Sequence, residues 1–192
     1  MDESVRVSAL LDASVLVPAV LRDTLLRAAA AGLYSVWFSE AILEEVQRAL
    51  VTNGFASSAS AKRMIAHLRS YFWFAFSTDY ESRISAMTNH PGDRHVLAAA
   101  VSANVGIIVT ANYRHFPESA LEPHTIIGMS PDTFLVMLLQ HDARAIVAIV
   151  AQQAAALKSP PLTVQDVLEG LRIHAPTFVE RVSTLIDTDK RP

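Results

Sequence analysis

Three acidic side chains stand at positions from which they could share one divalent cation. Asp12 follows the apolar run Val5–Leu11. Glu45 lies within the predicted helix Glu40–Leu50, and Asp93 precedes a second apolar helix. Carboxylates that converge on a small cavity repel one another unless a cation joins them, and ligands that are all oxygens favour Mg²⁺ or Mn²⁺ over zinc. Such a site can activate a water for the cleavage of a phosphodiester bond.

Helical geometry separates Glu45 from its neighbour Glu44. An apolar stripe runs along this helix at Ile42, Val46, Ala49 and Leu50. Glu45 falls inside the stripe, and a carboxylate turned inward needs a cation or a hydrogen-bond partner. Glu44 falls outside it, four residues before Arg48, where an exposed ion pair is expected. Glu45 is therefore the candidate ligand; the alternative is a carboxylate that reaches water from the edge of the stripe.

Further polar side chains follow the predicted strands or stand next to Asp93. They are Ser14, Thr110, Asn112, His115 and Arg94. Ligands of parallel α/β sheets bind beyond the carboxyl ends of the strands, so these groups could join the acids in one site. We expect Ser14, Thr110 and Asn112 to orient the carboxylates or a water. Arg94 and His115 would meet phosphate, and His115 could instead ligate a softer metal.

Each assignment has a plainer alternative. Asp12 alone could close a turn with the following backbone, and Asp93 could simply favour the start of a helix through the helix dipole. Asn112 could belong to an ordinary turn. Arg94, His95 and Arg114 could be surface charge. The combination of three acids with two strand ends is what favours a shared site.

Strands alternate with helices over the first part of the chain. The predicted strands are Val5–Leu11, Tyr34–Phe38 and Ile107–Val109, with Phe72–Phe76 and Thr125–Ile127 as further candidates. The predicted helices are Leu16–Ala31, in two pieces around Arg22–Asp23, then Glu40–Leu50, Ser60–Tyr71, Tyr80–Met87 and the apolar helix after Asp93. This alternation predicts βαβ units and a parallel sheet, which is an α/β fold.

The character of the chain changes after Ser130. Helices are predicted over Pro131–Gln140, Asp142–Leu157, Val164–Leu171 and Pro176–Ile186. The clearest linker is Ser159-Pro160-Pro161, because proline cannot continue a helix. We therefore expect a domain over residues 1–129 and a helical extension over 130–192 that packs on it.

The composition of the 192 residues limits the classes of protein. The chain is 51% hydrophobic and 18% charged, which predicts a substantial core. Its net charge of −3 argues against a surface coated in basic charge, but a bound metal can supply positive charge locally. The lack of cysteine excludes disulfides and thiolate zinc sites. Neither a secretory signal nor a membrane span is predicted, so we expect a cytoplasmic location.

Four segments in this order resemble the PIN domain family, in particular the VapC-like toxin components of bacterial toxin–antitoxin pairs. They are LLDASVLV, WFSEAILEEVQRAL, HPGDRHVLAAAV and IIVTANYRHFP, within about Val5 to Pro117. The later segment LKSPPLTVQDVLEGL resembles the helical tail of one branch of these toxins.

The resemblance implies a three-layer α/β/α sandwich with a parallel central sheet. It implies an endoribonuclease that uses Mg²⁺ or Mn²⁺, with Asp12, Glu45 and Asp93 as its acids, a small antitoxin protein as partner, and often a homodimer. The family commonly adds a fourth acid after the strand tip, where this chain offers Asn112 and His115. This departure predicts weaker binding of a second metal, a preference for Mn²⁺, or low activity.

Two other functions remain open. A degenerate PIN domain could bind RNA or a protein partner without cleaving, and the missing fourth acid favours it. A phosphatase of the haloacid dehalogenase type is the third possibility, because Asp12 follows a strand. That chemistry usually needs a second aspartate two residues later, where this chain has Ser14.

Overall fold

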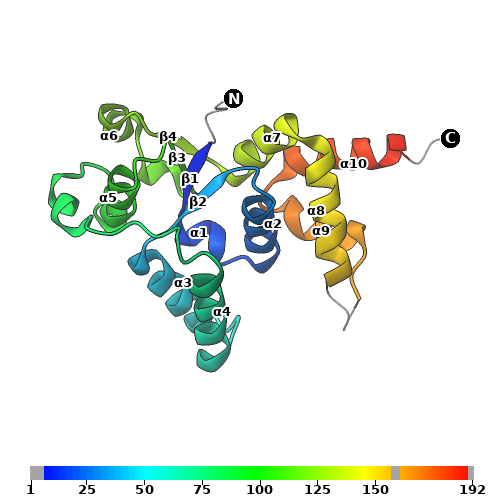
Figure 1. The fold of residues 1–192 in the computed structure, drawn as a ribbon, viewed down its shortest axis with the longest axis horizontal. Helices are drawn as coiled ribbons and strands as arrows, with labels where there is room; N and C mark the ends of the chain where they lie inside the picture. The colour runs from blue at the N-terminus through cyan, green and yellow to red at the C-terminus, as the bar shows by residue number, and fades with distance from the viewer. Residues whose placement is uncertain (1–6, 157–160, 190–192) are drawn as a thin grey trace. The chain divides into compact units, whose positions relative to one another are not determined.

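A parallel β-sheet organises the N-terminal part of the protein. The computed structural model describes residues 7–156 and 161–189. In these residues, four strands form one sheet in the order β2-β1-β3-β4, and all neighbours are parallel (Figure 1). The strands are β1 (Ser8–Leu11), β2 (Ser35–Trp37), β3 (Ile107–Val109) and β4 (Ile127–Met129). The predicted α/β class with a parallel central sheet is confirmed.

The strand order creates a crevice at the carboxyl ends of β1 and β3. From β1 the chain crosses to β2 on one side, whereas from β3 it crosses to β4 on the other side. Such a reversal between adjacent strands leaves a ligand-binding crevice beyond their carboxyl ends. Asp12 follows β1 and Thr110 follows β3, so both stand at this crevice.

Two helices position the other two acids, Glu45 and Asp93. Ser39 caps α3 (Glu40–Thr52) by accepting a hydrogen bond from the Ile42 backbone. The middle of α5 (Arg94–Ser102) is apolar and rich in alanine, and Val96–Ala100 are fully buried, so this helix packs closely on its neighbours. The remaining elements of this region are α1 (Ala13–Leu16), α4 (Ser58–Tyr71), α6 (Glu118–Leu121), η1 (Glu81–Ala86), η2 (Pro91–Asp93), η3 (Tyr113–His115) and η4 (Glu122–His124).

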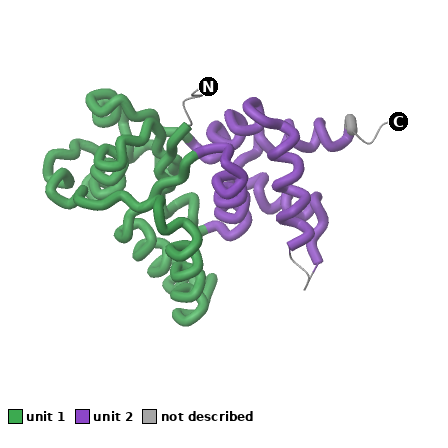
Figure 2. Tube along the Cα trace, viewed as in Figure 1, with its two compact units in different colours: residues 1–17, 35–129 green, residues 18–34, 130–192 purple. Residues whose placement is uncertain are grey.

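Contacts divide the chain into two compact units (Figure 2). Unit 1 comprises Met1–Val17 and Ser35–Met129, and unit 2 comprises Pro18–Tyr34 and Ser130–Pro192. Unit 2 contains α2 (Ala19–Ala30), α7 (Pro131–His141), α8 (Ala143–Ala156), α9 (Val164–Arg172) and α10 (Pro176–Asp189). The predicted boundary after residue 129 coincides with one limit of these units, but α2 clusters with the C-terminal helices. The division into two domains stays a prediction.

A buried polar contact joins α2 to α8 within unit 2. The Thr24 hydroxyl donates to Gln153 Oε1 at 2.7 Å, and Gln153 Nε2 donates to the Val20 carbonyl at 2.9 Å. Both Thr24 and Gln153 are buried. Because buried polar groups need partners, this network fixes the register between the two helices.

Three predicted elements differ from the structure. The helical break lies at Val17–Pro18, because proline has no N–H and clashes with the preceding turn. The last strand begins at Ile127, since Thr125 has a left-handed φ of 57° that a strand cannot contain. The aromatic segment Phe72–Phe76 contributes only a single bridge, between Phe76 and Phe38. The predicted linker Ser159-Pro160-Pro161 lies mostly outside the described residues.

Among the described helices, none is long and apolar enough by itself to cross a membrane. Together, α7 and α8 have the length and composition of a membrane span, but the pair is bent by 119° between the two helices.

Candidate active site

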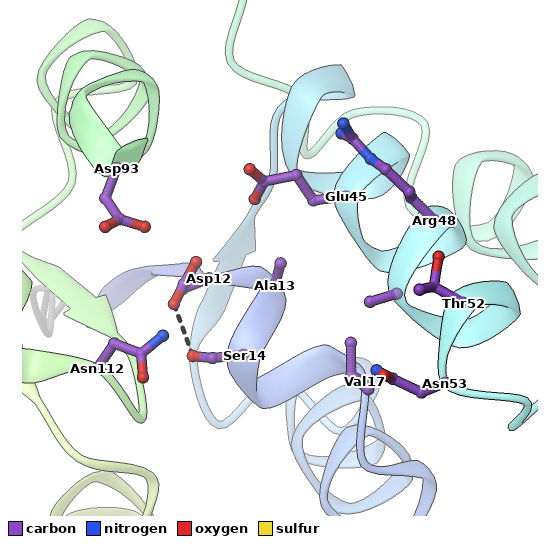
Figure 3. Close-up of a pocket in the computed structure, with 11 residues that line it drawn as sticks. Asp12, Ala13, Ser14, Val17, Glu45, Arg48, Thr52, Asn53, Asp93 and Asn112 are labelled. Carbon is purple, nitrogen blue, oxygen red and sulfur yellow. Dashed lines mark hydrogen bonds between the residues drawn. The ribbon is translucent and has the colours of Figure 1, made fainter. Parts of the chain in front are cut away.

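A polar pocket lies at the carboxyl ends of β1 and β3. Its volume is about 440 Å³. The lining includes all three predicted acids, Asp12, Glu45 and Asp93. Figure 3 shows their carboxylates pointing toward one another from three different elements. The rest of the lining comprises Ala13, Ser14, Val17, Arg48, Ala49, Thr52, Asn53 and Asn112.

Asp12 is held rigidly at the base of this pocket. Its backbone N–H continues the sheet by donating to the Val109 carbonyl at 3.0 Å. The side chain is 2% exposed, and two hydroxyls donate to the same carboxylate oxygen, Oδ2: Ser14 Oγ at 2.6 Å and Thr110 Oγ1 at 2.7 Å. Figure 3 shows the other oxygen turned toward Asp93 and Glu45.

Burial raises the pKa of the Asp12 carboxyl, and the nearby charge of Asp93 raises it further, although the hydroxyls of Ser14 and Thr110 act in the opposite direction. The ionised form is therefore costly in the metal-free protein. A cation beside Asp12 would remove that cost, and this favours a metal site over a simple turn.

The hydroxyls of Ser14 and Thr110 also connect β1 to the tip after β3. Ser14 Oγ accepts from the Ala111 backbone at 3.0 Å, and Thr110 Oγ1 accepts from the Asn112 backbone at 2.9 Å. Each hydroxyl thus accepts from one loop amide while it donates to Asp12. These contacts are the ones that orienting groups would make, and the orienting role of Ser14 and Thr110 stays a prediction. Asn112 lines the pocket, as expected of a group that meets water or substrate.

Glu45 enters the pocket from α3. Its side chain is 36% exposed, whereas the stripe residues Ile42 and Val46 are fully buried. His95 Nδ1 bonds the Gly92 carbonyl at 3.1 Å, which turns Nε2 toward Glu45 Oε2 at 3.5 Å. That distance is long for a hydrogen bond, and the contact is an ion pair when His95 is protonated. Burial lowers the pKa of the His95 imidazole, but Glu45, the Gly92 carbonyl and the charge of Asp93 together outweigh burial, so the net pKa is raised.

Asp93 does not serve as a helix cap. It occupies the N-cap position of α5, but among the described contacts its side chain makes no capping hydrogen bond. Its Oδ2 instead lies 2.7 Å from His115 Nδ1 and 3.2 Å from His90 Nδ1. The side chain is 17% exposed. The explanation that Asp93 merely favours the start of a helix therefore does not account for its contacts.

The arginine that lines the pocket is Arg48 and not the predicted Arg94. Arg94 bonds the Asn89 carbonyl at 3.4 Å and is not among the described lining residues. Arg48 lines the pocket instead, and no ion pair between Glu44 and Arg48 occurs in the described residues. The i to i+4 spacing suggested a surface pair, and only the tertiary structure shows that this face of α3 borders a cavity.

His90 is another residue near the site that the sequence analysis missed. It stands three residues before Asp93, in the loop that delivers this acid. The spacing His-x-x-Asp, followed by His115 after the next strand, was the available signal. His115 contacts Asp93 rather than lining the pocket.

The carboxylates fit the ion that the sequence implies. Asp12, Glu45 and Asp93 offer oxygen ligands only, and their pocket is open enough for water and a phosphate group. Flexible acids on a surface would move apart because their charges repel. These three are held near one another because Asp12 follows β1, Glu45 lies on α3 and Asp93 directly precedes α5. The arrangement can hold a hard divalent cation at the edge of the sheet.

Comparison with known proteins agrees with this geometry. Residues 8–114 match the PIN domain family, and residues 131–184 match the family described as the VapC50 C-terminal domain. The chain is 40% identical over 111 residues to a protein of Mycobacterium tuberculosis (strain ATCC 25618 / H37Rv) named "Putative ribonuclease VapC50". The match covers 58% of this chain and 66% of that relative. No solved structure matches the chain significantly.

Proposed function

Because this chain belongs to the PIN domain family, we propose that it is a metal-dependent endoribonuclease and the toxin of a type II toxin–antitoxin pair. The observation that carries the proposal is the convergence of Asp12, Glu45 and Asp93 on one pocket. The similarity of residues 131–184 to the VapC50 C-terminal domain, and of the chain to a protein named as a ribonuclease, supports the toxin assignment.

The residues of the pocket have two different roles in this proposal. Asp12, Glu45 and Asp93 would hold Mg²⁺ or Mn²⁺, and Ser14 and Thr110 keep the Asp12 carboxylate in one orientation. When bound, the ion would act as a Lewis acid that activates water and stabilises the leaving oxygen of a phosphodiester.

The substrate would be met by two polar groups that line the pocket. Arg48 offers a guanidinium to a phosphate of the RNA, and Asn112 offers an amide to the same region. The net charge of −3 is compatible with an RNA substrate, because the cation supplies the positive charge where phosphate binds.

The partners follow from the same proposal. The protein would act on RNA in the cytoplasm, bind a small antitoxin protein and form a homodimer. These assignments rest on family resemblance and extend the naming of the relative to this chain.

Calorimetric titration with Mg²⁺ and Mn²⁺, followed by incubation with a mixed single-stranded RNA, tests the proposal. We expect saturable binding in the wild type that disappears in Asp12→Asn, and RNA products with 5′-phosphate and 3′-hydroxyl ends. Metal binding without cleavage of any RNA would instead favour a degenerate PIN domain that binds RNA or a partner. No binding of either ion would contradict the metal site itself.

A further inference from the structure

We propose that His90, Asp93 and His115 form a second cation site that takes a transition metal such as Zn²⁺ in preference to Mg²⁺. The site shares Asp93 with the proposed ribonuclease centre, but its ligands and its test do not require that the protein cleaves RNA. Two imidazoles and one carboxylate make a mixed nitrogen and oxygen ligand set.

The three side chains already stand at chelating separations. One ligand atom from each residue lies within 4.8 Å of the other two. His115 Nδ1 and His90 Nδ1 approach the same Asp93 oxygen at 2.7 and 3.2 Å. Ligands about 2.0–2.2 Å from zinc in tetrahedral geometry are separated by roughly 3.3–3.5 Å, so a slight opening of these contacts would admit the ion.

His90 Nδ1 has two polar neighbours. The Gly92 backbone nitrogen lies 3.3 Å away, and Asp93 Oδ2 lies 3.2 Å away. A ring nitrogen that carries no proton and a carboxylate oxygen are both acceptors, so their close approach needs a proton or a cation between them. A divalent cation bound there would satisfy both groups.

The backbone holds the two loops together without the metal. The His90 N–H donates to the His115 carbonyl at 3.0 Å, and the Asp93 N–H donates to the His90 carbonyl at 2.9 Å. The two imidazole rings stack with centroids 4.1 Å apart and an angle of 16° between planes. Because the nitrogen lone pair of each imidazole lies in the plane of its ring, both rings would rotate about their side-chain bonds to bind one ion, while the backbone stays in place.

The site is open to solvent on the histidine side. The side chains of His90 and His115 are 52% and 41% exposed, whereas that of Asp93 is 17% exposed. An ion can therefore enter directly and complete its coordination with water. Mg²⁺ prefers oxygen ligands in octahedral geometry, while imidazole suits Zn²⁺ and its neighbours, so these ligands select the softer ion.

The family commonly places a fourth acid where this chain offers Asn112 and His115, and the structure gives the histidine a chemical meaning. The substitution does not leave a gap, because the imidazole contacts Asp93 directly and His90 joins it. The chain would thus exchange an all-oxygen position for a nitrogen-rich one and change the metal that binds there.

The test is a calorimetric Zn²⁺ titration of the full chain in saturating Mg²⁺, which occupies the carboxylate pocket. We expect one Zn²⁺ site in the wild type. His90→Ala and His115→Ala should each weaken it about tenfold or more, and His67→Ala, an exposed histidine on α4, should leave it unchanged. His115→Asp should lose Zn²⁺ affinity and gain a second Mg²⁺ site.

Electron paramagnetic resonance of Cu²⁺ bound to the same variants provides a readout of the ligands themselves. Hyperfine coupling to two imidazole nitrogens is expected in the wild type and to one in His90→Ala or His115→Ala. Zn²⁺ affinity that does not change in either variant, or a Cu²⁺ spectrum without nitrogen coupling, would overturn the proposal. So would a wild type that binds no Zn²⁺, in which case the three groups form a proton-sharing cluster only.

The variant Asp12→Asn separates this proposal from the ribonuclease assignment. It should abolish Mg²⁺ binding in the pocket and leave the Zn²⁺ site intact, because Asp12 contacts neither histidine in the described structure. Absence of RNA cleavage would then count against the proposed function alone, and Zn²⁺ binding lost with Asp12→Asn would count against the separate histidine site.

Discussion

The carboxylate of Asp12 is buried beside a second acid, and its pKa is raised. A raised pKa means that the folded state holds the proton more tightly than the unfolded state does. The contribution of this carboxyl to the stability of the metal-free protein is therefore greatest below its unfolded pKa of about 3.9, and it is lost as the pH rises through the folded pKa. At neutral pH this carboxylate destabilises the fold.

Replacement of Asp12 by asparagine should consequently raise the melting temperature of the metal-free protein at pH 7. Asparagine keeps an oxygen that can accept from Ser14 and Thr110 and carries no charge. Mn²⁺ should raise the melting temperature of the wild type but not that of the variant. Thermal melts in a chelator measure both effects, with Asp79→Asn, an exposed aspartate, as the control. A variant that melts below the wild type in chelator would contradict the burial argument.

A substitution of Thr110 tests whether its hydrogen bond to the Asp12 carboxylate is needed for metal binding. Thr110→Val keeps the shape of the side chain but removes the hydroxyl that donates to Asp12 and accepts from Asn112. Loss of such a partner typically lowers metal affinity or activity by about 10–100-fold. Calorimetry and RNA cleavage should both show the loss. The exposed Thr78→Val provides the control, and equal losses in the two variants would refute the role of Thr110.

Site residues that directly follow a predicted strand could be predicted from the sequence. Asp12, Ser14 and Thr110 follow from the strand pattern, and the helical stripe distinguished Glu45 from Glu44. The sequence could not show that Arg94 turns to a backbone carbonyl or that His90 stacks on His115. Both depend on loop conformations fixed by long-range hydrogen bonds. The assignment of these residues to a metal site remains a prediction.

At the scale of elements, α3 matters because it delivers Glu45. Ser39→Ala removes its N-cap and should lower the free energy of unfolding by about 1 kcal/mol. It should also reduce RNA cleavage, since the first turns of α3 set the position of Glu45. Ser57→Ala removes the equivalent cap of α4 and is the matched control, because that helix contributes no described residue to the pocket. Denaturant unfolding and cleavage rates measure the pair; equal cleavage would contradict the positioning role.

The elements themselves were largely predictable, and the exceptions have local causes. Asp23 looked like a helix break, yet it pairs with Arg27 one turn later at 2.9 Å and is stable inside α2. Trp73 and Phe74 have strand-forming side chains but are 75% and 62% exposed, because the chain turns there and only Phe76 reaches a strand partner. Propensity favours a conformation, but pairing with a neighbour decides it.

At the scale of the whole molecule, the chain order does not match the grouping of the helices. Residues 18–34 lie between two strands of unit 1 but cluster with the C-terminal helices. Sequence patterns assign a helix to its neighbours along the chain, whereas contacts such as the buried hydrogen bond between Thr24 and Gln153 show its actual partners. The family matches instead follow the chain order. Residues 8–114, which include α2, match the PIN domain family, and residues 131–184 match the VapC50 C-terminal domain.

Thr24→Val tests whether α2 is integral to unit 2. It leaves Gln153 Oε1 buried without its donor and should destabilise the protein by about 1–3 kcal/mol. Divalent metal binding at the pocket of unit 1 should be unchanged, because neither residue lines it. Urea unfolding and Mg²⁺ calorimetry provide the two readouts, with the exposed Thr177→Val as control. Unaltered stability would show that this contact does not hold α2 in place.

The central claim, that the inward-facing acids of one pocket carry out metal-dependent cleavage of RNA, is tested most directly by two neighbouring glutamates. Glu45 lines the pocket and Glu44, one residue earlier on α3, is exposed outside it. The measurement is the rate of RNA cleavage in Mg²⁺ or Mn²⁺ by Glu45→Gln and Glu44→Gln. We predict that Glu45→Gln loses cleavage by at least about a hundredfold while Glu44→Gln retains the wild-type rate. Equal rates in the two variants would contradict the account.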